Sequence, residues 1–597
     1  MNQIGGPVQQ GQGTVAWTTG PDRRTIHERE LSSRLGLLYR PEEARRLAPE
    51  LLDLASSQPR RADSGRNDCM LIVYADTIVT GDEPPLKTLG RFLGRHFGDT
   101  FGRLHLLPFF PSSSDDGFAV IDYRRVNHRL GGWEEVRGLS ERHDTMFDLV
   151  INHCSRESLW FADFIGGRDP GRHYFITLPE ESDTSAVVRP RTTPLVSAVH
   201  TYAGIRHVWN TFSDDQVDLD FSNPAVLREF VDILFYYVAR GARLIRLDAI
   251  AFLWKRLGTS CMSLPETHAV VKILRLLLDY AGAGVRLVTE TNVPHEENIS
   301  YFGNRDEAHL VYQFSLSPLL LYSYVFGDTG YLRDWASRLE PRPRDCSFVN
   351  IFATHDGIGL RPLEGLVPEG EVARLVDRMH ARGGFVTLRQ ASRRESGPVL
   401  KPYEINIAPF SAFGGRPDNL PAYLGAHTLL MSFQGAPAIY IHSLLATPND
   451  LDLVEETGRT RSINRGRWQL GDLEARLADP GSVQAKALEH FRRVVAVRSA
   501  QEVFQLDASQ LAMPTPKGAF AMFRESRRQS ILVVASVLGR SQRVPCTEWG
   551  IEPGVYVDLL TGSRVPLADS IGLGPWQVLW LDVSDEPTAP EPSRTPR

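Results

Sequence analysis

Short apolar runs rich in β-branched residues recur along the middle of the chain, with longer helix-like stretches between them. The runs cover residues 69–79, 103–111, 146–153, 242–250, 285–291, 310–314, 346–356 and 436–443. Stretches such as 223–240 and 266–282 carry apolar residues at helical spacing. Any one run could also be a turn of buried helix, but eight buried strands alternating with helices are typical of a (β/α)8 TIM barrel. The sequence therefore predicts an α/β fold built on this barrel.

The pattern changes on both sides of the barrel and within it. Residues 24–57 predict two helices, the second with Pro41 in its first turn. The stretch after the third strand is rich in Pro, Arg and Thr and is long enough for an inserted subdomain. Beyond the barrel, short alternating runs without helices predict an antiparallel β domain. The expected organisation is a disordered N-terminus at 1–20, an N-terminal helical extension at 21–68, a barrel at 69–505 with an inserted subdomain at about 154–222, a C-terminal β domain at 506–585 and a disordered tail at 586–597.

Composition narrows the class of protein. The formal charge of −6, from 66 basic and 72 acidic residues, argues against a nucleic-acid binder. The first 20 residues lack the features of a signal peptide, and no apolar run reaches 18 residues. Five scattered cysteines fit neither a disulfide framework nor a zinc site. We expect a soluble cytoplasmic protein that binds neither nucleic acid nor membrane, and the sequence leaves a homodimer open.

Polar side chains follow five of the predicted strands, at the barrel face that carries active sites. A single charged residue in such a place usually caps a helix or lies on a solvated rim. Here five strand ends carry carboxylates, histidines and an arginine, and helix caps or a solvated rim do not explain so many together. The polar residues are Asp115, Asp116, Asn152, His153, Arg246, Asp248, Glu290, His355 and Asp356. Phe118 lies in the same loop as Asp115 and Asp116.

The carboxylates at these strand ends indicate glycoside chemistry. Retaining enzymes pair one carboxylate that attacks the anomeric carbon with one that protonates the leaving oxygen. Asp248 suits the nucleophile, because Arg246 two residues earlier favours its ionised form. Glu290 suits the acid, with a pKa raised by neighbouring carboxylates. Asp356 would hold ring hydroxyls and stabilise the transition state.

Four segments, DLVINH, RLIRLDAI, LVTE and FATHD, occur in this order on the predicted strands. They resemble the signature segments of the α-amylase clan, glycoside hydrolase family 13, across residues 69–500. The resemblance implies the catalytic roles given above for Asp248, Glu290 and Asp356.

The same resemblance extends to the sugar site. It implies that His153, Arg246 and His355 bind the glucosyl unit. Asn152 corresponds to a calcium ligand in many α-amylases, but sucrose phosphorylases manage without calcium, and we therefore predict no metal.

Longer segments resemble sucrose phosphorylases in particular. They are LHLLPFFPSSSDDGFAVIDY, LDAIAFLWKRLGTSC and SINR at 462–465. The resemblance implies that Asp115 holds the far glucose hydroxyls, that Phe118 lines the same pocket and that Arg465 reaches the region of the 4-hydroxyl. It also implies transfer of an α-glucosyl group to inorganic phosphate as co-substrate, without any cofactor, to give α-glucose 1-phosphate.

The acceptor region departs from sucrose phosphorylases. Their YQ pair, in the loop that meets fructose and phosphate, is Tyr403-Glu404 here. The N-terminal extension and the segments 187–195, 206–213 and 289–304 look more like glucosylglycerate phosphorylases, which cleave 2-O-α-glucosyl-glycerate.

A carboxylate-bearing acceptor needs a cation nearby, and Arg189 or Arg191 could supply it. The alternative is that both arginines are solvated loop residues. Glu404 would repel such an acceptor unless an arginine neutralises it.

Other functions stay open at this point. Sucrose or glucosylglycerol phosphorylase would share the glucose pocket, and an α-glucosidase or transglucosidase would share the whole catalytic set. A non-catalytic amylase-like scaffold is disfavoured, since such proteins usually lack one of the three acids.

Overall fold

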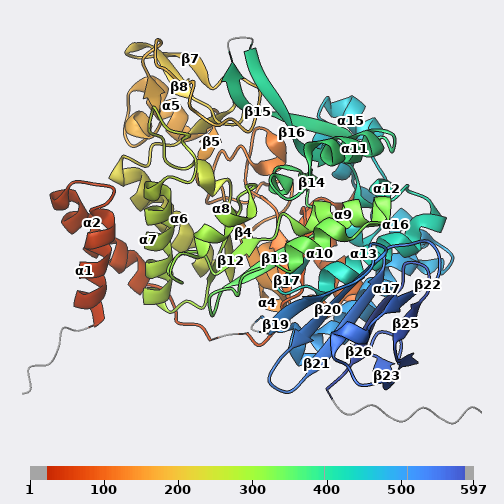
Figure 1. The fold of residues 1–597 in the computed structure, drawn as a ribbon. Helices are drawn as coiled ribbons and strands as arrows, with labels where there is room; N and C mark the ends of the chain where they lie inside the picture. Colours follow the sequence, from red (N-terminus) through yellow and green to blue (C-terminus); the bar gives the residue numbers. More distant parts are fainter. Residues whose placement is uncertain (1–22, 63, 395–396, 507, 585–597) are drawn as a thin grey trace, which may run out of the picture.

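The computed structural model describes residues 23–62, 64–394, 397–506 and 508–584, so the predicted disordered ends, 1–20 and 586–597, lie outside the described residues. Its centre is a closed barrel of eight parallel strands (Figure 1). The barrel strands are β1 (Met70–Val73), β3 (Arg103–Leu106), β4 (Asp144–Leu149), β10 (Leu244–Leu247), β11 (Arg286–Thr289), β12 (Leu310–Tyr312), β13 (Ser347–Ile351) and β17 (Ala436–Tyr440). Each predicted run overlaps one of them, which confirms the TIM barrel.

Helices connect the barrel strands, as parallel pairing requires. All residues of β1, β3, β10, β13 and β17 are buried, because the helices cover the outer face of the barrel. The main connecting helices are α3 (Pro85–His96), α4 (Trp133–Arg142), α6 (Pro224–Ala239), α7 (Pro265–Ala281), α8 (His295–Ile299), α9 (Leu316–Phe326), α10 (Gly330–Ala336), α13 (Leu420–Ser432) and α17 (Val483–Ser499).

Strand alternation places charged residues inside the barrel. Side chains two apart along a strand share a face, so Arg246 and Asp248 point to the same side. Arg246 of β10 is in register with Asp148 of β4. Both are buried, and the pair lies directly below the ends of these strands.

The insertion predicted after the third barrel strand is present. It contains β5 (His153–Ser155), α5 (Leu159–Gly166), β6 (Thr177–Leu178), β7 (Val196–Thr201), β8 (Gly204–Trp209) and β9 (Gln216–Asp218). Strands β6, β8 and β7 form a small sheet, and β5 pairs with β9. The β5–β9 pairing sets Ser155 opposite Gln216 and thereby brings Gln216 to the barrel mouth.

The excursion between β13 and β17 builds a second wall. Strands β14 (Ile358–Gly359), β16 (Gly397–Asn406) and β15 (Phe385–Arg394) form a sheet, with α11 (Glu369–His380) and α12 (Pro409–Ala412) nearby in sequence. The long β15–β16 hairpin extends beside β7 and β8 in Figure 1. A backbone bridge between Arg189 and Gln390 joins the insertion to this hairpin.

After β17 the chain forms α14 (Ile441–Leu444), α15 (Leu451–Thr457), a 3-10 turn at Thr460–Asn464 and α16 (Leu470–Ala478). The short β18 (Trp468–Gln469) pairs with β2 (Ile78–Val79). This region packs over the barrel mouth from the β17 side, because Thr460 and Asn464 donate hydrogen bonds to Asn406 Oδ1 and Thr354 O.

Two further parts flank the barrel. Helix α1 (Arg23–Leu35) packs on α7, and α2 (Pro41–Ser56) packs on α6 and α7. The C-terminal antiparallel sheet has the order β19 (Ser509–Met513), β20 (Ala519–Glu525), β21 (Ser530–Ser536), β26 (Val578–Asp582), β23 (Gly554–Asp558) and β24 (Arg564–Leu567). A small pair, β22 (Gln542–Pro545) and β25 (Ser570–Leu573), completes it. Within the described part of the chain, no helix combines the length and apolar character that crossing a membrane requires.

Candidate active site

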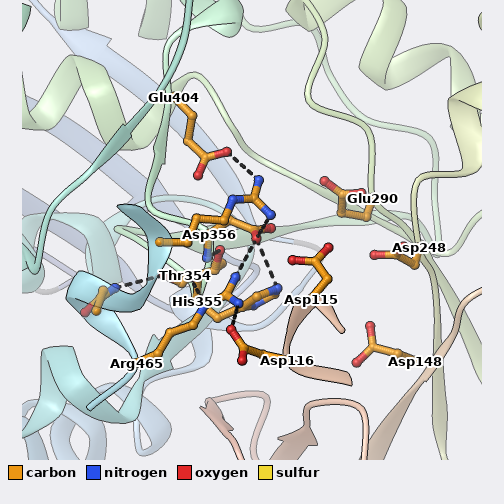
Figure 2. A network of polar contacts seen from close by, with 12 residues as sticks. Asp115, Asp116, Asp148, Asp248, Glu290, Thr354, His355, Asp356, Glu404 and Arg465 are labelled. Carbon is orange, nitrogen blue, oxygen red and sulfur yellow. Dashed lines mark hydrogen bonds and ion pairs between the residues drawn. The ribbon is translucent and has the colours of Figure 1, made fainter. Parts of the chain in front are cut away.

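A cavity at the carboxyl ends of the barrel strands gathers most of the predicted site residues. Figure 2 shows Asp115, Asp248, Glu290 and Asp356 around a common space, with Glu404 farther along the wall. The predicted residues that line this cavity are Asp115, Phe118, His153, Arg191, Arg246, Asp248, Glu290, His355, Asp356, Tyr403 and Glu404. Arg189 and Arg465 are not among its lining residues.

One guanidinium joins the two predicted catalytic carboxyls. Arg246 Nη1 lies 2.7 Å from Asp248 Oδ1, and Arg246 Nη2 lies 3.9 Å from Glu290 Oε2. Arg246 Nη1 also donates to Asp148 Oδ1 at 2.6 Å, and His105 Nε2 donates to Asp148 Oδ2 at 2.8 Å. The buried Asp148 therefore orients the arginine that faces both carboxyls.

The causes of the pKa shifts in this pair differ from the sequence expectation, which named Arg246 for Asp248 and neighbouring carboxylates for Glu290. Burial, more than neighbouring carboxylates, raises the pKa of Glu290, with a further contribution from Asp356. Burial also raises the pKa of Asp248, even though Arg246 opposes the rise and the charge of Glu290 adds to it. Arg246 is thus not the dominant influence on Asp248. Because Arg246 is nearer to Asp248 than to Glu290, we infer that the proton shared by the pair rests on Glu290.

The backbone after Asp248 takes part in the same arrangement. Ala249 has a φ of +51°, a left-handed conformation that is uncommon for alanine. Its N–H donates to Glu290 Oε2 at 3.1 Å. The strained backbone of Ala249 therefore orients the predicted acid, and backbone strain of this kind is often found at functional sites.

Asp356 lies beside two arginines and His355. Arg461 Nη1 is 2.7 Å, Arg465 Nη2 is 3.3 Å and His355 Nε2 is 3.4 Å from Asp356 Oδ1. Burial would raise the pKa of Asp356, but Arg461, His355 and Arg465 together hold it well below its usual range. Asp356 is therefore ionised, as its predicted role in holding ring hydroxyls and stabilising an oxocarbenium-like charge requires.

Arg461 is a site residue that the sequence analysis did not single out. Its Nη2 lies 2.7 Å from Glu404 Oε2, so the same guanidinium that contacts Asp356 also neutralises Glu404. Asn406 Nδ2 donates to Glu404 Oε1 at 2.7 Å. Burial raises the pKa of Glu404, and Arg461 opposes that rise. This ion pair neutralises the Glu404 carboxylate, which would otherwise repel an anionic acceptor.

We predict that Arg461→Gln lowers kcat/KM by about 100-fold, the effect of removing one charge-stabilising donor. The pKa of Asp356 and of Glu404 should rise when the cation is lost, so the acid limb of the pH–rate profile should move to higher pH. Arg459→Gln, two residues away and half exposed, is the matched control. An acid limb that stays in place in the Arg461 variant would contradict this assignment.

The predicted glucose-binding residues lie close together. The rings of Phe118 and His355 stack with centroids 4.9 Å apart. Burial lowers the pKa of His355 to about 3, and burial also lowers the pKa of His153. Both imidazoles are therefore neutral at physiological pH and suited to hydrogen bonding with sugar hydroxyls. His153 Nε2 donates to Phe118 O at 3.0 Å, which fixes the two residues together.

Asp115 is ionised in spite of being buried. Burial would raise its pKa, but Arg461, Arg465 and Arg191 outweigh it and lower the pKa of Asp115 below its ordinary value. Gln216 Nε2 donates to Asp115 Oδ2 at 3.2 Å. Gln216 also lines the cavity, so the insertion contributes a side chain to the sugar site that the sequence did not indicate.

The loop that carries Asp115 has an unusual backbone. Asp115 and Asp116 have φ values of +51° and +49°, and Gly117 follows with +112°. A Cβ at Gly117 would come within 2.7 Å of Pro108 O, so only glycine fits there. Asp116 pairs with Arg465, whose Nε donates to His355 O at 2.9 Å. Arg465 thus supports His355 and Asp356 from behind the cavity wall.

The two candidate acceptor arginines have different surroundings. Arg189 Nη1 contacts Gln390 Oε1 at 3.5 Å, on the β15 strand. Arg191 lines the cavity, and its guanidinium carbon lies 5.9 Å from the centroid of the Tyr403 ring. Arg191 Nη1 is buried and makes no hydrogen bond. Of the two, Arg191 is the one placed to meet a ligand.

Asn152 contacts a lysine. Lys255 Nζ donates to Asn152 Oδ1 at 2.7 Å and lies 2.5 Å from Asp218 Oδ2. Among the described residues, no group of three or more His, Cys, Asp or Glu side chains is arranged to hold a metal ion. The ammonium group of Lys255 joins the end of β4 to the insertion through these two contacts.

We predict that Lys255→Met destabilises the protein by about 3 kcal/mol, because breaking a buried ion pair leaves Asp218 charged and buried. Thermal unfolding monitored by circular dichroism would measure this. Lys486→Met, at an exposed position of α17, is the control. Equal unfolding temperatures for the two variants would contradict a structural role of the Lys255–Asp218 pair.

The sequence analysis did not single out the cavity residues His105, Gln216 and Arg461, nor Asp148, which contacts Arg246 and His105. His105 and Asp148 carried a signal, since each is a polar or charged residue with apolar neighbours on both sides in a buried strand. Arg461 lies four residues before Arg465, directly ahead of the SINR segment at 462–465. Gln216 carried none, because the small β5–β9 pairing that places it depends on three-dimensional structure.

Comparison with known proteins agrees with this site. The α-amylase catalytic domain matches residues 100–325. A glucosylglycerate phosphorylase of Spirochaeta thermophila is 41% identical over 530 residues, covering 86% of this chain and 89% of that protein. A sucrose phosphorylase of Bifidobacterium adolescentis is 30% identical over 449 residues, covering 72% and 85%. The crystal structure of a sucrose 6F-phosphate phosphorylase from Thermoanaerobacter thermosaccharolyticum superposes with a TM-score of 0.69 at 27% identity, covering 80% and 95%.

The chain therefore belongs to the α-amylase family, glycoside hydrolase family 13. Its greater identity to the glucosylglycerate phosphorylase than to the sucrose phosphorylase agrees with the sequence expectation drawn from the N-terminal extension and the acceptor loops.

Proposed function

We propose that this protein is a retaining glycoside phosphorylase that converts 2-O-α-glucosyl-glycerate and inorganic phosphate into α-glucose 1-phosphate and glycerate. The observation that carries the proposal is the cavity in which Asp248, Glu290 and Asp356 converge beside Arg191, whose buried Nη1 makes no hydrogen bond. The identity to glucosylglycerate phosphorylase over most of the chain supports the choice of substrate.

In the first step an Asp248 oxygen attacks the anomeric carbon of the bound glucosyl group. The bond between that carbon and the glycosidic oxygen breaks, and the proton on Glu290 passes to the leaving oxygen of glycerate. The contact of Arg246 with both carboxyls supports this division of roles. The product of the step is a β-glucosyl ester of Asp248.

In the second step phosphate takes the place of glycerate. A phosphate oxygen attacks the anomeric carbon from the opposite side, Asp248 leaves, and the Glu290 carboxylate accepts any proton that phosphate releases. Two inversions give net retention, so the product is the α-anomer. Asp356 and the neutral His355 would stabilise the positive charge on the ring in both steps.

The acceptor region favours an anion. Arg191 offers a free donor at the cavity wall, and Glu404 is already neutralised by Arg461. We assign Arg191 to the glycerate carboxylate and Tyr403 to the same subsite, with Arg189 and Glu404 as supporting residues of the walls. We further propose that the enzyme acts in the cytoplasm and needs neither a metal nor another cofactor.

The test compares donors. Glucosylglycerate, sucrose and glucosylglycerol are offered separately in phosphate buffer, and α-glucose 1-phosphate is measured. The proposal predicts a kcat/KM for glucosylglycerate at least about 100-fold above those of the two neutral donors, as expected when a buried donor is otherwise left unpaired. A preference for sucrose would leave the mechanism standing and overturn the acceptor assignment.

A further inference from the structure

Asn292 is a further cavity residue with a buried polar atom that makes no hydrogen bond. It follows Glu290 by two positions and lines the same space. Its side-chain oxygen Oδ1 is buried and has no hydrogen-bond partner. A buried acceptor without a donor is unfavourable, so a ligand with a hydroxyl or amine at this place would satisfy it.

The position of Asn292 follows from its contact with β14. A Cβ added to Gly359 would come within 2.9 Å of Asn292 Oδ1 and 3.0 Å of Nδ2, so the asparagine side chain lies directly against this glycine. Gly359 is paired with Glu404 in the β14–β16 register, and Leu360 N donates to Tyr403 O at 2.8 Å. Asn292 therefore belongs to the wall that carries Tyr403 and Glu404.

Arg191 stands at the same wall. Its guanidinium lies over the Tyr403 ring, and its unpartnered Nη1 is a donor, whereas the unpartnered Oδ1 of Asn292 is an acceptor. The two free atoms are complementary to different groups of one small ligand. An anion suits Arg191, and a hydroxyl group suits Asn292.

We propose that Asn292 is a specificity-determining residue that accepts a hydrogen bond from the free hydroxyl of the acceptor, while Arg191 binds its carboxylate. This inference rests on the proposed function, in which Glu290 touches the oxygen that links glucose to glycerate. In glycerate the linked oxygen is on carbon 2, so the 3-hydroxyl is the group that reaches Asn292. The preferred acceptors are then small hydroxy acids with a second hydroxyl.

The experiment uses the synthetic direction. Phosphate release from α-glucose 1-phosphate is measured with glycerate, with lactate, which keeps the carboxylate and the 2-hydroxyl but lacks the 3-hydroxyl, and with glycerol, which lacks the carboxylate. The wild type should prefer glycerate over lactate by about 10-fold or more. Asn292→Leu, similar in shape but without the acceptor oxygen, should bring this ratio close to one and leave the preference for glycerate over glycerol.

Three further variants separate the explanations. Arg191→Gln should have the opposite effect, reducing the glycerate-to-glycerol ratio and sparing the glycerate-to-lactate ratio. Gly359→Ala should displace the Asn292 side chain and lower the glycerate-to-lactate ratio without altering Asn292 itself. Asn304→Leu, at an exposed position, is the control and should keep both ratios.

The outcomes are distinguishable. A wild-type glycerate-to-lactate ratio that persists in both Asn292→Leu and Gly359→Ala would overturn the role of Asn292 and leave the proposed function in place. A wild type that does not use glycerate as an acceptor would overturn the proposed function, and this inference with it.

Discussion

Asp248→Ala is expected to lower glucosyl transfer to phosphate by at least about 10⁴-fold, as the loss of a catalytic nucleophile does in other enzymes. The physical reason is that Asp248, held by Arg246 at 2.7 Å, supplies the attacking oxygen, and without it the β-glucosyl ester cannot form. The measurement is kcat for phosphorolysis of glucosylglycerate, with circular dichroism to show that the fold is kept.

The shortened side chain also leaves room for an external nucleophile. With α-glucosyl fluoride as donor and azide in the buffer, the Asp248→Ala enzyme should form β-glucosyl azide, because attack occurs once from the face that Asp248 occupied. Asp279→Ala, on the surface of α7, is the control and should keep wild-type activity. An Asp248 variant that still makes α-glucose 1-phosphate at a wild-type rate would contradict the assignment.

Glu290→Gln is expected to lower kcat/KM for glucosylglycerate by about 10²- to 10⁴-fold, the usual contribution of a general acid. Glutamine keeps the shape of the side chain, and its carbonyl oxygen can still accept the hydrogen bond from the Ala249 N–H. It has no acidic proton to donate to the leaving oxygen. The loss toward α-glucosyl fluoride should be much smaller in the glucosylation step, since fluoride leaves without protonation.

The comparison of the two donors is the control within this experiment. A purely structural effect of Glu290→Gln would lower the rates with both donors equally, and that result would contradict the role as acid. The pH profile adds a second check. The pKa of Glu290 is raised in the folded protein. Wild-type activity on glucosylglycerate should therefore fall at high pH as Glu290 loses its proton, and this basic limb should weaken in the Glu290→Gln variant.

The barrel and the catalytic acids were predictable because both depend on local sequence. Eight buried strands produce eight apolar runs whatever the loops between them do, and the carboxyl ends of parallel strands meet at one face. Asp248, Glu290 and Asp356 each follow such a run directly. Their convergence in the cavity required no knowledge of the insertion or of the β14–β16 sheet.

The acceptor side was not predictable to the same degree, because it is assembled from segments far apart in sequence. Arg461 neutralises Glu404 across 57 residues, and Arg191, which comes from the insertion, lies over the Tyr403 ring. Protonation also depends on packing. The sequence suggested that Arg246 decides the charge of Asp248, whereas burial is the larger influence on both catalytic carboxyls.

The most direct test of the account follows glucosylglycerate by proton NMR in the presence and absence of phosphate. The account predicts that phosphate accelerates consumption of the donor and that the first-formed sugar product is α-glucose 1-phosphate, with the anomeric configuration retained. Free glucose formed at a rate independent of phosphate, or a product with the β configuration, would contradict a retaining phosphorylase.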